Sequence, residues 1–175
     1  MVAGATGWVY SCERNHKSKP ARMIKLDRTL TYRLHLLHKL TDLESQRAYV
    51  ADARLSMSDG RCLTAIGTFA PLSVNDLAQK ANLNKGQASR AAQSLVDQGL
   101  VIKAASPTDG RGVVLTLTPK GKAAWQRAMQ VVGRRNDDIF GVLSAAEREQ
   151  LSDFFDRLIA KARADGGAAE EGGDE

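Results

Sequence analysis

Cysteine, aromatic residues and long apolar runs are all scarce in this chain of 175 residues. Its two cysteines, Cys12 and Cys62, are too few and too far apart for a fold held together by disulfides. No apolar run reaches the roughly 18 residues that a membrane-spanning helix needs. The amino-terminal segment lacks the charged and apolar regions of a secretory signal. We therefore expect a protein of the reducing cytoplasm with no membrane partner.

The residue patterns of common enzymes are also missing. The sequence contains no G-x-S-x-G motif, no H-E-x-x-H motif and no phosphate-binding loop. None of its three histidines lies beside a plausible nucleophile in the sequence. We therefore expect no enzymatic activity, no catalytic residues and no cofactor.

Acidic residues are unevenly distributed. Five of the 20 acidic residues lie in the tail from Asp165 to Glu175, which contains no basic residue. Residues 1–164 thus hold 25 basic and 15 acidic side chains, a net charge of +10. A body this basic indicates a polyanionic partner, with nucleic acid first and an anionic membrane surface second.

Apolar periodicity predicts helices at both ends of the chain. The first is a long helix whose apolar face begins at Leu26 and which is predicted to continue to about Val50. A second helix is expected after Ser58, with Cys62, Leu63 and Ile66 on its apolar face. Near the carboxyl end, Pro119 is expected to open a helix after Thr118, and Ser144 with Glu147 to cap another. The residues on these terminal apolar faces are Leu26, Leu30, Leu34 and Leu37, then Trp125, Met129, Val132, Ile139 and Leu143, and finally Leu151, Phe154, Phe155, Leu158 and Ile159.

Residues 73–99 predict two helices joined by a tight turn. Each begins with a helix-capping residue that is followed, three positions later, by a side chain able to return the hydrogen bond. These pairs are Ser73 with Asp76 and Asn84 with Gln87. The first helix is expected to end near Ala81 and the second at Gln98, before Gly99. Two strands follow, 100–104 and 113–118, with the turn-forming segment 106–111 between them.

This order of helix, turn, helix and hairpin is typical of proteins that read double-stranded DNA in the major groove. Arg can pair with guanine and Gln or Asn with adenine, whereas Lys and Ser suit phosphate contacts. At the hairpin turn, Arg111 could enter a narrow minor groove, with Asp109 holding its guanidinium. The predicted buried face of the second helix is Ala88, Ala91, Leu95 and Val96. We predict DNA contacts from Ser73, Asn84, Lys85, Gln87, Ala88, Ser89, Arg90, Gln93, Asp109 and Arg111.

The hairpin also carries a family resemblance. Asp109-Gly110-Arg111, followed by Leu115-Thr116-Leu117-Thr118-Pro119-Lys120-Gly121, resembles the wing signature D-x-R-x3-L-x-L-T-x2-G of MarR-type regulators at every fixed position. The resemblance covers about residues 26–162 and includes Leu77-Ala78, Ala88-Ser89-Arg90, Leu95 and Gly99-Leu100-Val101. It implies a winged-helix homodimer with interlocking first, fifth and sixth helices. It also implies a palindromic operator and, usually, repression relieved by a small molecule.

The expected fold is mainly helical with a small β-hairpin wing, that is, a winged helix-turn-helix with amino- and carboxy-terminal dimerisation helices. The terminal apolar faces support the dimer, because long exposed apolar stripes are uncommon in monomers. The expected parts are a mobile arm (1–22), a dimerisation helix (23–55), the DNA-binding domain (56–118), carboxy-terminal dimerisation helices (119–164) and a disordered acidic tail (165–175).

The resemblance places an effector cavity near the first helix, where Arg33, His35 and His38 are our candidate ligand-binding residues. Arg or His would neutralise the charge of an aromatic acid, and an apolar wall would hold its ring. The run 134–140 resembles family members linked to the catabolism of aromatic compounds. We therefore expect a small aromatic carboxylic or phenolic effector.

Three alternatives remain open. His35 and His38 share a helix face, as a metal sensor needs, but no neighbouring cluster completes a tetrahedral set, so we predict no metal site. Cys62 could be a redox switch, although its apolar helix face favours a buried thiol. A sequence-neutral architectural DNA-binding protein is the third, and the Gln, Asn and Arg of the reading face argue against it.

Overall fold

The computed structural model describes residues 24–105 and 112–170, with side chains described to residue 165. The chain divides into two units, one ending at Leu37 and the other running from His38 to Glu175. A short 3-10 turn, Leu26–Arg28, precedes α1, Leu30–Ala48. The prediction of one helix containing Leu26 is wrong, because Thr29 adopts an extended conformation and separates that turn from α1. A π-helical turn, Tyr49–Ala53, follows α1.

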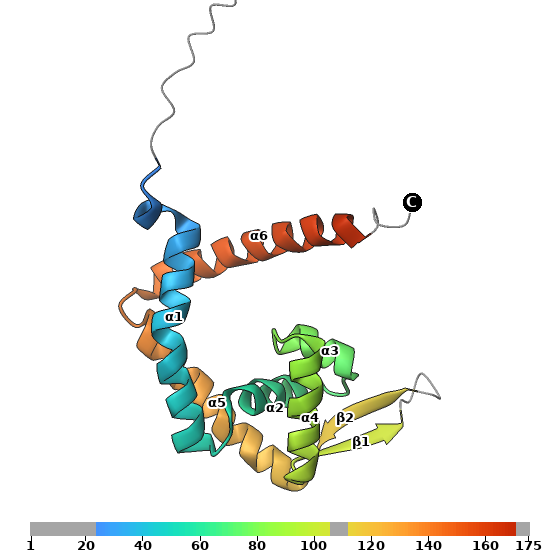
Figure 1. Cartoon of the computed structure of the whole chain (residues 1–175). Helices are drawn as coiled ribbons and strands as arrows, with labels where there is room; N and C mark the ends of the chain where they lie inside the picture. Colours follow the sequence, from blue (N-terminus) through green and yellow to red (C-terminus); the bar gives the residue numbers. More distant parts are fainter. Residues whose placement is uncertain (1–23, 106–111, 171–175) are drawn as a thin grey trace, which may run out of the picture. The chain divides into compact units, whose positions relative to one another are not determined.

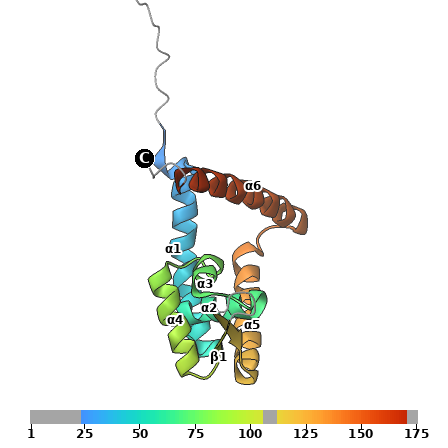
Figure 2. The same ribbon diagram turned by 90° about the vertical axis from the view of Figure 1, so that its right-hand side faces the viewer.

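Helix α2, Met57–Phe69, begins two residues earlier than the sequence indicated. Ser56, not Ser58, caps it, and the Ser56 hydroxyl accepts a hydrogen bond of 3.1 Å from the backbone N–H of Asp59. Its predicted apolar face is confirmed, since Cys62, Leu63 and Ile66 are completely buried. This helix contacts both α4 and α5, and it therefore forms the centre of the second unit (Figure 2).

Helices α3, Val74–Lys80, and α4, Lys85–Asp97, form the predicted pair (Figure 1). Both expected capping pairs are present, and each is reciprocal. Gly99 follows α4 with a φ of +67°, a left-handed conformation that costs glycine little. The capping residues therefore predict correctly where the turn between α3 and α4 lies and where α4 ends.

The hairpin consists of β1, Val101–Ala105, and β2, Val113–Leu117, paired antiparallel with Val101 opposite Leu117. Leu72, just before α3, bridges to Leu115 on β2 and so holds the hairpin against the helical pair. The structure is mostly helical with this one two-stranded hairpin among the described residues, which confirms the predicted fold class. The hairpin turn, with Asp109 and Arg111, lies outside the described residues.

Helix α5, Pro119–Phe140, begins at the predicted proline, and the Thr118 side chain caps it through the N–H of Gly121. Its buried face differs from the large apolar residues that we expected, because Met129 and Val132 are more than a third exposed. The face packed on the core consists instead of small residues and one valine: Gly121, Ala124, Ala128 and Val131.

Small residues allow the helices to approach closely. A Cβ atom added at Gly67 of α2 would lie 2.2 Å from Cδ1 of Trp125 on α5. One added at Gly121 would lie 1.8 Å from the carbonyl oxygen of Leu100. These contacts fix α5 against α2 and against the start of the hairpin.

Helix α6, Ala145–Glu170, begins with the predicted capping pair, since Ser144 and Glu147 exchange hydrogen bonds. These bonds from the Ser144 N–H and hydroxyl lower the pKa of Glu147. Across residues 24–105 and 112–170, no helix has the length and apolarity needed to cross a membrane.

Candidate DNA interface and ligand pocket

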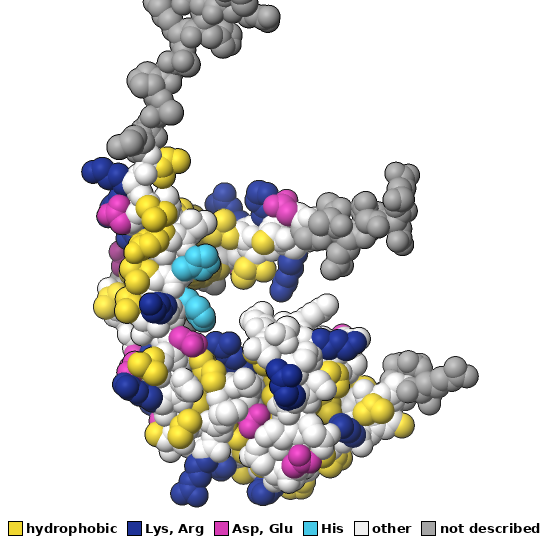
Figure 3. Space-filling view, in the orientation of Figure 1, with side chains coloured by type: hydrophobic (Ala, Val, Ile, Leu, Met, Phe, Trp, Pro, Cys, Tyr) yellow, Lys and Arg dark blue, Asp and Glu magenta, His cyan; other side chains and the backbone are white. Residues whose placement is uncertain are grey.

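Helix α4 presents a polar face to solvent beside the hairpin. The side chains of Lys85, Ser89 and Arg90 are exposed and make no hydrogen bond within the part of the chain that the structure describes. In Figure 3 this side of α3, α4 and the hairpin is mainly white, the colour of the backbone and of side chains that are neither charged nor hydrophobic, with separate Lys and Arg side chains and some acidic and hydrophobic ones between them. Such a surface can offer phosphate contacts and base contacts together.

Two of the predicted base-reading residues also have a structural role. The side-chain oxygen of Asn84 accepts a 2.8 Å hydrogen bond from the Gln87 N–H, and that of Gln87 accepts a 3.1 Å bond from the Asn84 N–H. The oxygen of Gln87 is therefore engaged in capping, and only its amide NH₂ group is left to donate. Ser73 is similar, since its hydroxyl lies 2.7 Å from the carboxylate of Asp76.

Gln93 connects α4 to the hairpin. Its amide nitrogen donates to the Asp97 carboxylate at 2.7 Å, and its oxygen accepts from Lys103 of β1 at 2.8 Å. Ala88, which was predicted among the DNA contacts, is completely buried, so its side chain is not available to DNA. That part of the prediction is wrong because Ala88 belongs to the core face of α4, with Ala91, Ala92 and Leu95.

A pocket of about 640 Å³ opens in the second unit between α2, α3 and α5. Two cations, Arg61 and Lys80, lie in its wall, and none of the described residues that line it carries a carboxylate. The Lys80 ammonium group lies 5.0 Å from the centre of the Phe69 ring. The complete lining is His38, Arg61, Thr64, Ala65, Thr68, Phe69, Lys80, Ala81, Asn82, Met129 and Val132.

This lining combines positive charge with an apolar wall. Phe69, Met129 and Val132 offer a surface for a flat ring, while Arg61 and Lys80 can pair with an anion. Arg61 also lies 3.4 Å from the carboxylate of Asp42 on α1. The pocket therefore suits a small aromatic acid or phenolate better than a neutral or cationic ligand.

The predicted ligand residues divide between the two units. His38 lines the pocket, whereas Arg33 and His35 are exposed on the part of α1 that belongs to the first unit. Sequence reasoning missed Arg61 and Lys80. No local pattern distinguishes them from other exposed cations, because the pocket appears only when α2 and α3 pack.

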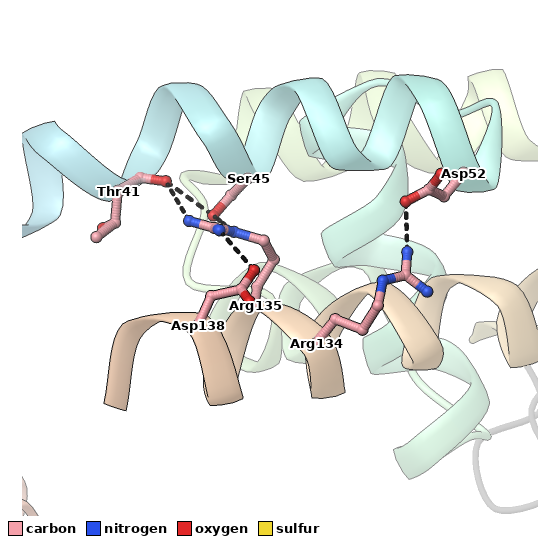
Figure 4. Close-up of polar contacts among 6 residues, drawn as sticks. All are labelled: Thr41, Ser45, Asp52, Arg134, Arg135 and Asp138. Carbon is pink, nitrogen blue, oxygen red and sulfur yellow. Dashed lines mark hydrogen bonds and ion pairs between the residues drawn. The ribbon is translucent and has the colours of Figure 1, made fainter. Parts of the chain in front are cut away.

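Two arginines of α5 tie this helix to the segment that carries His38 (Figure 4). Arg135 donates to the Asp138 carboxylate at 2.9 Å, to the Ser45 hydroxyl at 3.4 Å and to the Thr41 carbonyl at 3.5 Å. Arg134 pairs with Asp52 in the π-helical turn. These bonds hold the second half of α1 on α5 and so fix one wall of the pocket.

Cys62 is an unsuitable redox switch in this structure. Its thiol is completely buried, and burial, together with the charge of Asp59, raises its pKa to about 12. A thiol reacts with oxidants as its thiolate, which this environment disfavours. Cys12 lies outside the described residues, and no group of three or more His, Cys, Asp or Glu residues suited to a metal ion occurs among those described.

Comparison with known proteins gives a consistent result. The sequence profile of the MarR family matches residues 55–112, from the start of α2 into the hairpin. A putative transcriptional regulatory protein for the hcr operon of Thauera aromatica is 33% identical over 96 residues. That match covers 55% of this chain and 58% of the relative, so the chain spans less than two thirds of that relative's length.

Solved structures share the fold over a larger part of the chain. A MarR-family regulator from Silicibacter pomeroyi matches with a TM-score of 0.69 and 22% identity, over 79% of this chain and 92% of the other. The MarR-family protein Rv2887 of Mycobacterium tuberculosis, in complex with salicylic acid, matches with a TM-score of 0.62 and 26% identity, over 75% and 97%. Residues 55–112 thus match the MarR family of helix-turn-helix transcriptional regulators, and the solved MarR-family structures share the fold over most of the chain.

Proposed function

We propose that this protein is a repressor that binds a palindromic operator as a homodimer and is released from it by a small aromatic carboxylate or phenol. One observation carries the proposal: the cation-containing pocket is built from α2 and α3, the same helices that support α4. A ligand in that pocket contacts the DNA-binding unit itself. It can therefore shift the unit between two arrangements, provided that it binds one of them more tightly.

DNA binding is supported by the exposed face of α4 and by the hairpin beside it. Arg90 is the candidate for a guanine contact, and Lys85 and Ser89 for phosphate contacts. Arg111, in the hairpin turn outside the described residues, is proposed to enter the minor groove with Asp109 beside it. The proposed interface is completed by four residues that also serve as capping or bridging residues: Ser73, Asn84, Gln87 and Gln93.

A homodimer is supported by apolar side chains that the second unit leaves open to solvent. On α1, Leu40 and Leu43 are 65% and 52% exposed, and on α6, Leu158 is 62% exposed. Long apolar rows are uncommon on monomers, and a second copy of the chain would cover them. A two-fold axis would also place the two α4 helices about one turn of DNA apart, as a palindromic operator requires.

The effector class follows from the pocket lining. Arg61, Lys80 and His38 would bind a carboxylate or phenolate, and Phe69 and Met129 would contact the ring. Rv2887, the relative from Mycobacterium tuberculosis, holds salicylic acid, which makes salicylate a suitable first probe.

Footprinting of genomic DNA, followed by titration with salicylate, tests this function. We expect discrete protected sites with two-fold symmetry, a dimer in light scattering and release of DNA by salicylate. Uniform coverage of DNA would instead indicate an architectural protein. Release by zinc or peroxide, but not by salicylate, would contradict the proposed effector.

A further inference from the structure

Asp59 of α2 is the one charged side chain that is buried among residues 24–105 and 112–165, with an exposed fraction of 9%. A buried carboxylate is costly unless hydrogen bonds compensate for its lost hydration. Here one compensating side chain belongs to Ser94 of α4 and the other to Gln98, the residue that directly follows α4. The Ser94 hydroxyl donates to Oδ2 of Asp59 at 3.0 Å, and the Gln98 amide donates to the same oxygen at 3.2 Å.

These bonds form a closed network at the carboxyl end of α4. The Gln98 amide also lies 3.0 Å from the Ser94 hydroxyl, so the three side chains contact one another. The Gln98 carbonyl accepts a 2.8 Å hydrogen bond from the Lys120 ammonium group of α5. The last turn of α4 is therefore held on two sides, by a carboxylate of α2 and by a cation of α5.

The position of the network matters because Ser94 and Gln98 lie at the carboxyl end of α4, away from the proposed base contacts. Arg90 and Gln87 lie one to three turns nearer the amino end of the helix. A carboxylate bound to the far end can fix the rotation and tilt of α4 without touching DNA. Since hydrogen bonds to a charged group are directional and strong, sliding or rotating α4 on α2 would break them and leave a buried charge unpaired.

We propose that Asp59 is a positioning residue for sequence reading: its carboxylate sets the orientation of α4 on α2, and with it the alignment of the base-contacting side chains. The inference rests on the proposed DNA-binding function. This orienting role of Asp59 differs from a general contribution to stability in its effect on DNA binding. Partial unfolding removes binding to all duplexes equally, whereas a misaligned α4 loses base contacts and keeps most phosphate contacts.

The test compares Asp59→Asn with the unmodified full-length protein on two duplexes, an operator selected from random DNA by the unmodified protein and a scrambled version of it. We expect the affinity for the operator to fall about tenfold, as the loss of a charge-assisted hydrogen bond implies, and the affinity for the scrambled duplex to change less than about twofold. Asp137→Asn, which removes an exposed carboxylate from α5, is the matched control and should change neither affinity.

A double variant separates orientation from stability. Asp59→Asn combined with Gln98→Glu moves the carboxylate from α2 to the residue that follows α4 and keeps a charge-assisted bond between α2 and the end of α4, so discrimination should recover towards the original value. Equal losses on both duplexes, or unchanged discrimination in Asp59→Asn, would overturn the inference while leaving the proposed function intact. If the unmodified protein selects no operator, both proposals fail.

Discussion

The guanidinium group of Arg61 lies 3.4 Å from the carboxylate of Asp42, so a residue in the pocket wall on α2 is paired with a residue on α1. Both side chains are partly exposed, and pairs of this kind contribute only about 0–1 kcal/mol to stability. The pairing orients Arg61 at the pocket without committing its whole hydrogen-bonding capacity, because a guanidinium has five donors.

Arg61→Ala is expected to weaken salicylate binding about tenfold or more, since a hydrogen bond to a charged group contributes about 1.5–3 kcal/mol. Affinity for DNA without salicylate should stay within about twofold, because Arg61 is not on the exposed face of α4. Calorimetric titration with salicylate measures the first quantity and fluorescence anisotropy the second. Arg47→Ala, which removes an exposed arginine that forms an ion pair with Glu44 of its own helix, is the control. Unchanged salicylate affinity in Arg61→Ala would remove Arg61 from the site.

Arg90→Ala should reduce affinity for the selected operator by about 1–3 kcal/mol and should relax discrimination against other sequences. Lys85→Ala should weaken all duplexes alike and reduce the slope of log affinity against log salt by about one, because it removes one phosphate contact. The contrast between the two variants identifies which residue reads bases. If Arg90→Ala retained full discrimination, the assignment of α4 as the reading helix would be wrong.

Gly67→Ala is expected to destabilise the fold by about 1–3 kcal/mol, because the new methyl group would overlap the Trp125 ring of α5. Gly133→Ala is the matched control on an exposed part of α5, where an added Cβ meets nothing within 4 Å. That substitution should be neutral or should stabilise the helix by up to about 1 kcal/mol. Urea denaturation of both variants measures the difference. Equal stabilities would show that α2 and α5 separate readily at this contact.

The Cys62 thiol should resist alkylation in the native protein, because it is buried and its pKa is raised to about 12. A Cys12→Ser variant leaves Cys62 as the sole thiol to be measured. The raised pKa also predicts a pH dependence of stability. The folded state retains the proton more strongly than the unfolded state, so this contribution is complete below about pH 9 and is lost as the pH rises towards 12.

Denaturation at a series of pH values above 8 checks the second effect. Cys62→Ala should show a shallower decline in the free energy of unfolding than the Cys12→Ser protein. Rapid labelling of Cys62 at neutral pH would contradict the buried position of the thiol and would reopen the redox alternative.

Local patterns predicted most of the second unit. The capping pairs at Ser73, Asn84 and Ser144, and the glycine after α4, depend on residues close in sequence, and each was placed correctly. The start of α2 was misplaced because two serines, Ser56 and Ser58, offer the same chemistry two residues apart.

Features that depend on packing between distant segments were not predictable in this way. Arg61 and Lys80 meet in one pocket although 19 positions separate them, and Asp59 contacts residues 35 and 39 positions away. Ala88 was assigned to two faces of α4 from its sequence context, and only the packing of α4 on the core decides between them.

The backbone contact between Gly121 and Leu100 joins the first turn of α5 to the residue that directly precedes β1. The Thr118 hydroxyl and N–H also reach the Leu100 carbonyl, at 3.2 and 3.0 Å. Because this junction is tightly packed and hydrogen-bonded, we expect a displacement of α5 to move the hairpin and the end of α4 with it. In a dimer joined through its terminal helices, the spacing between half-sites would then be set by the angle between the two α5 helices. Operators with one base pair added at the centre would measure the stiffness of that angle.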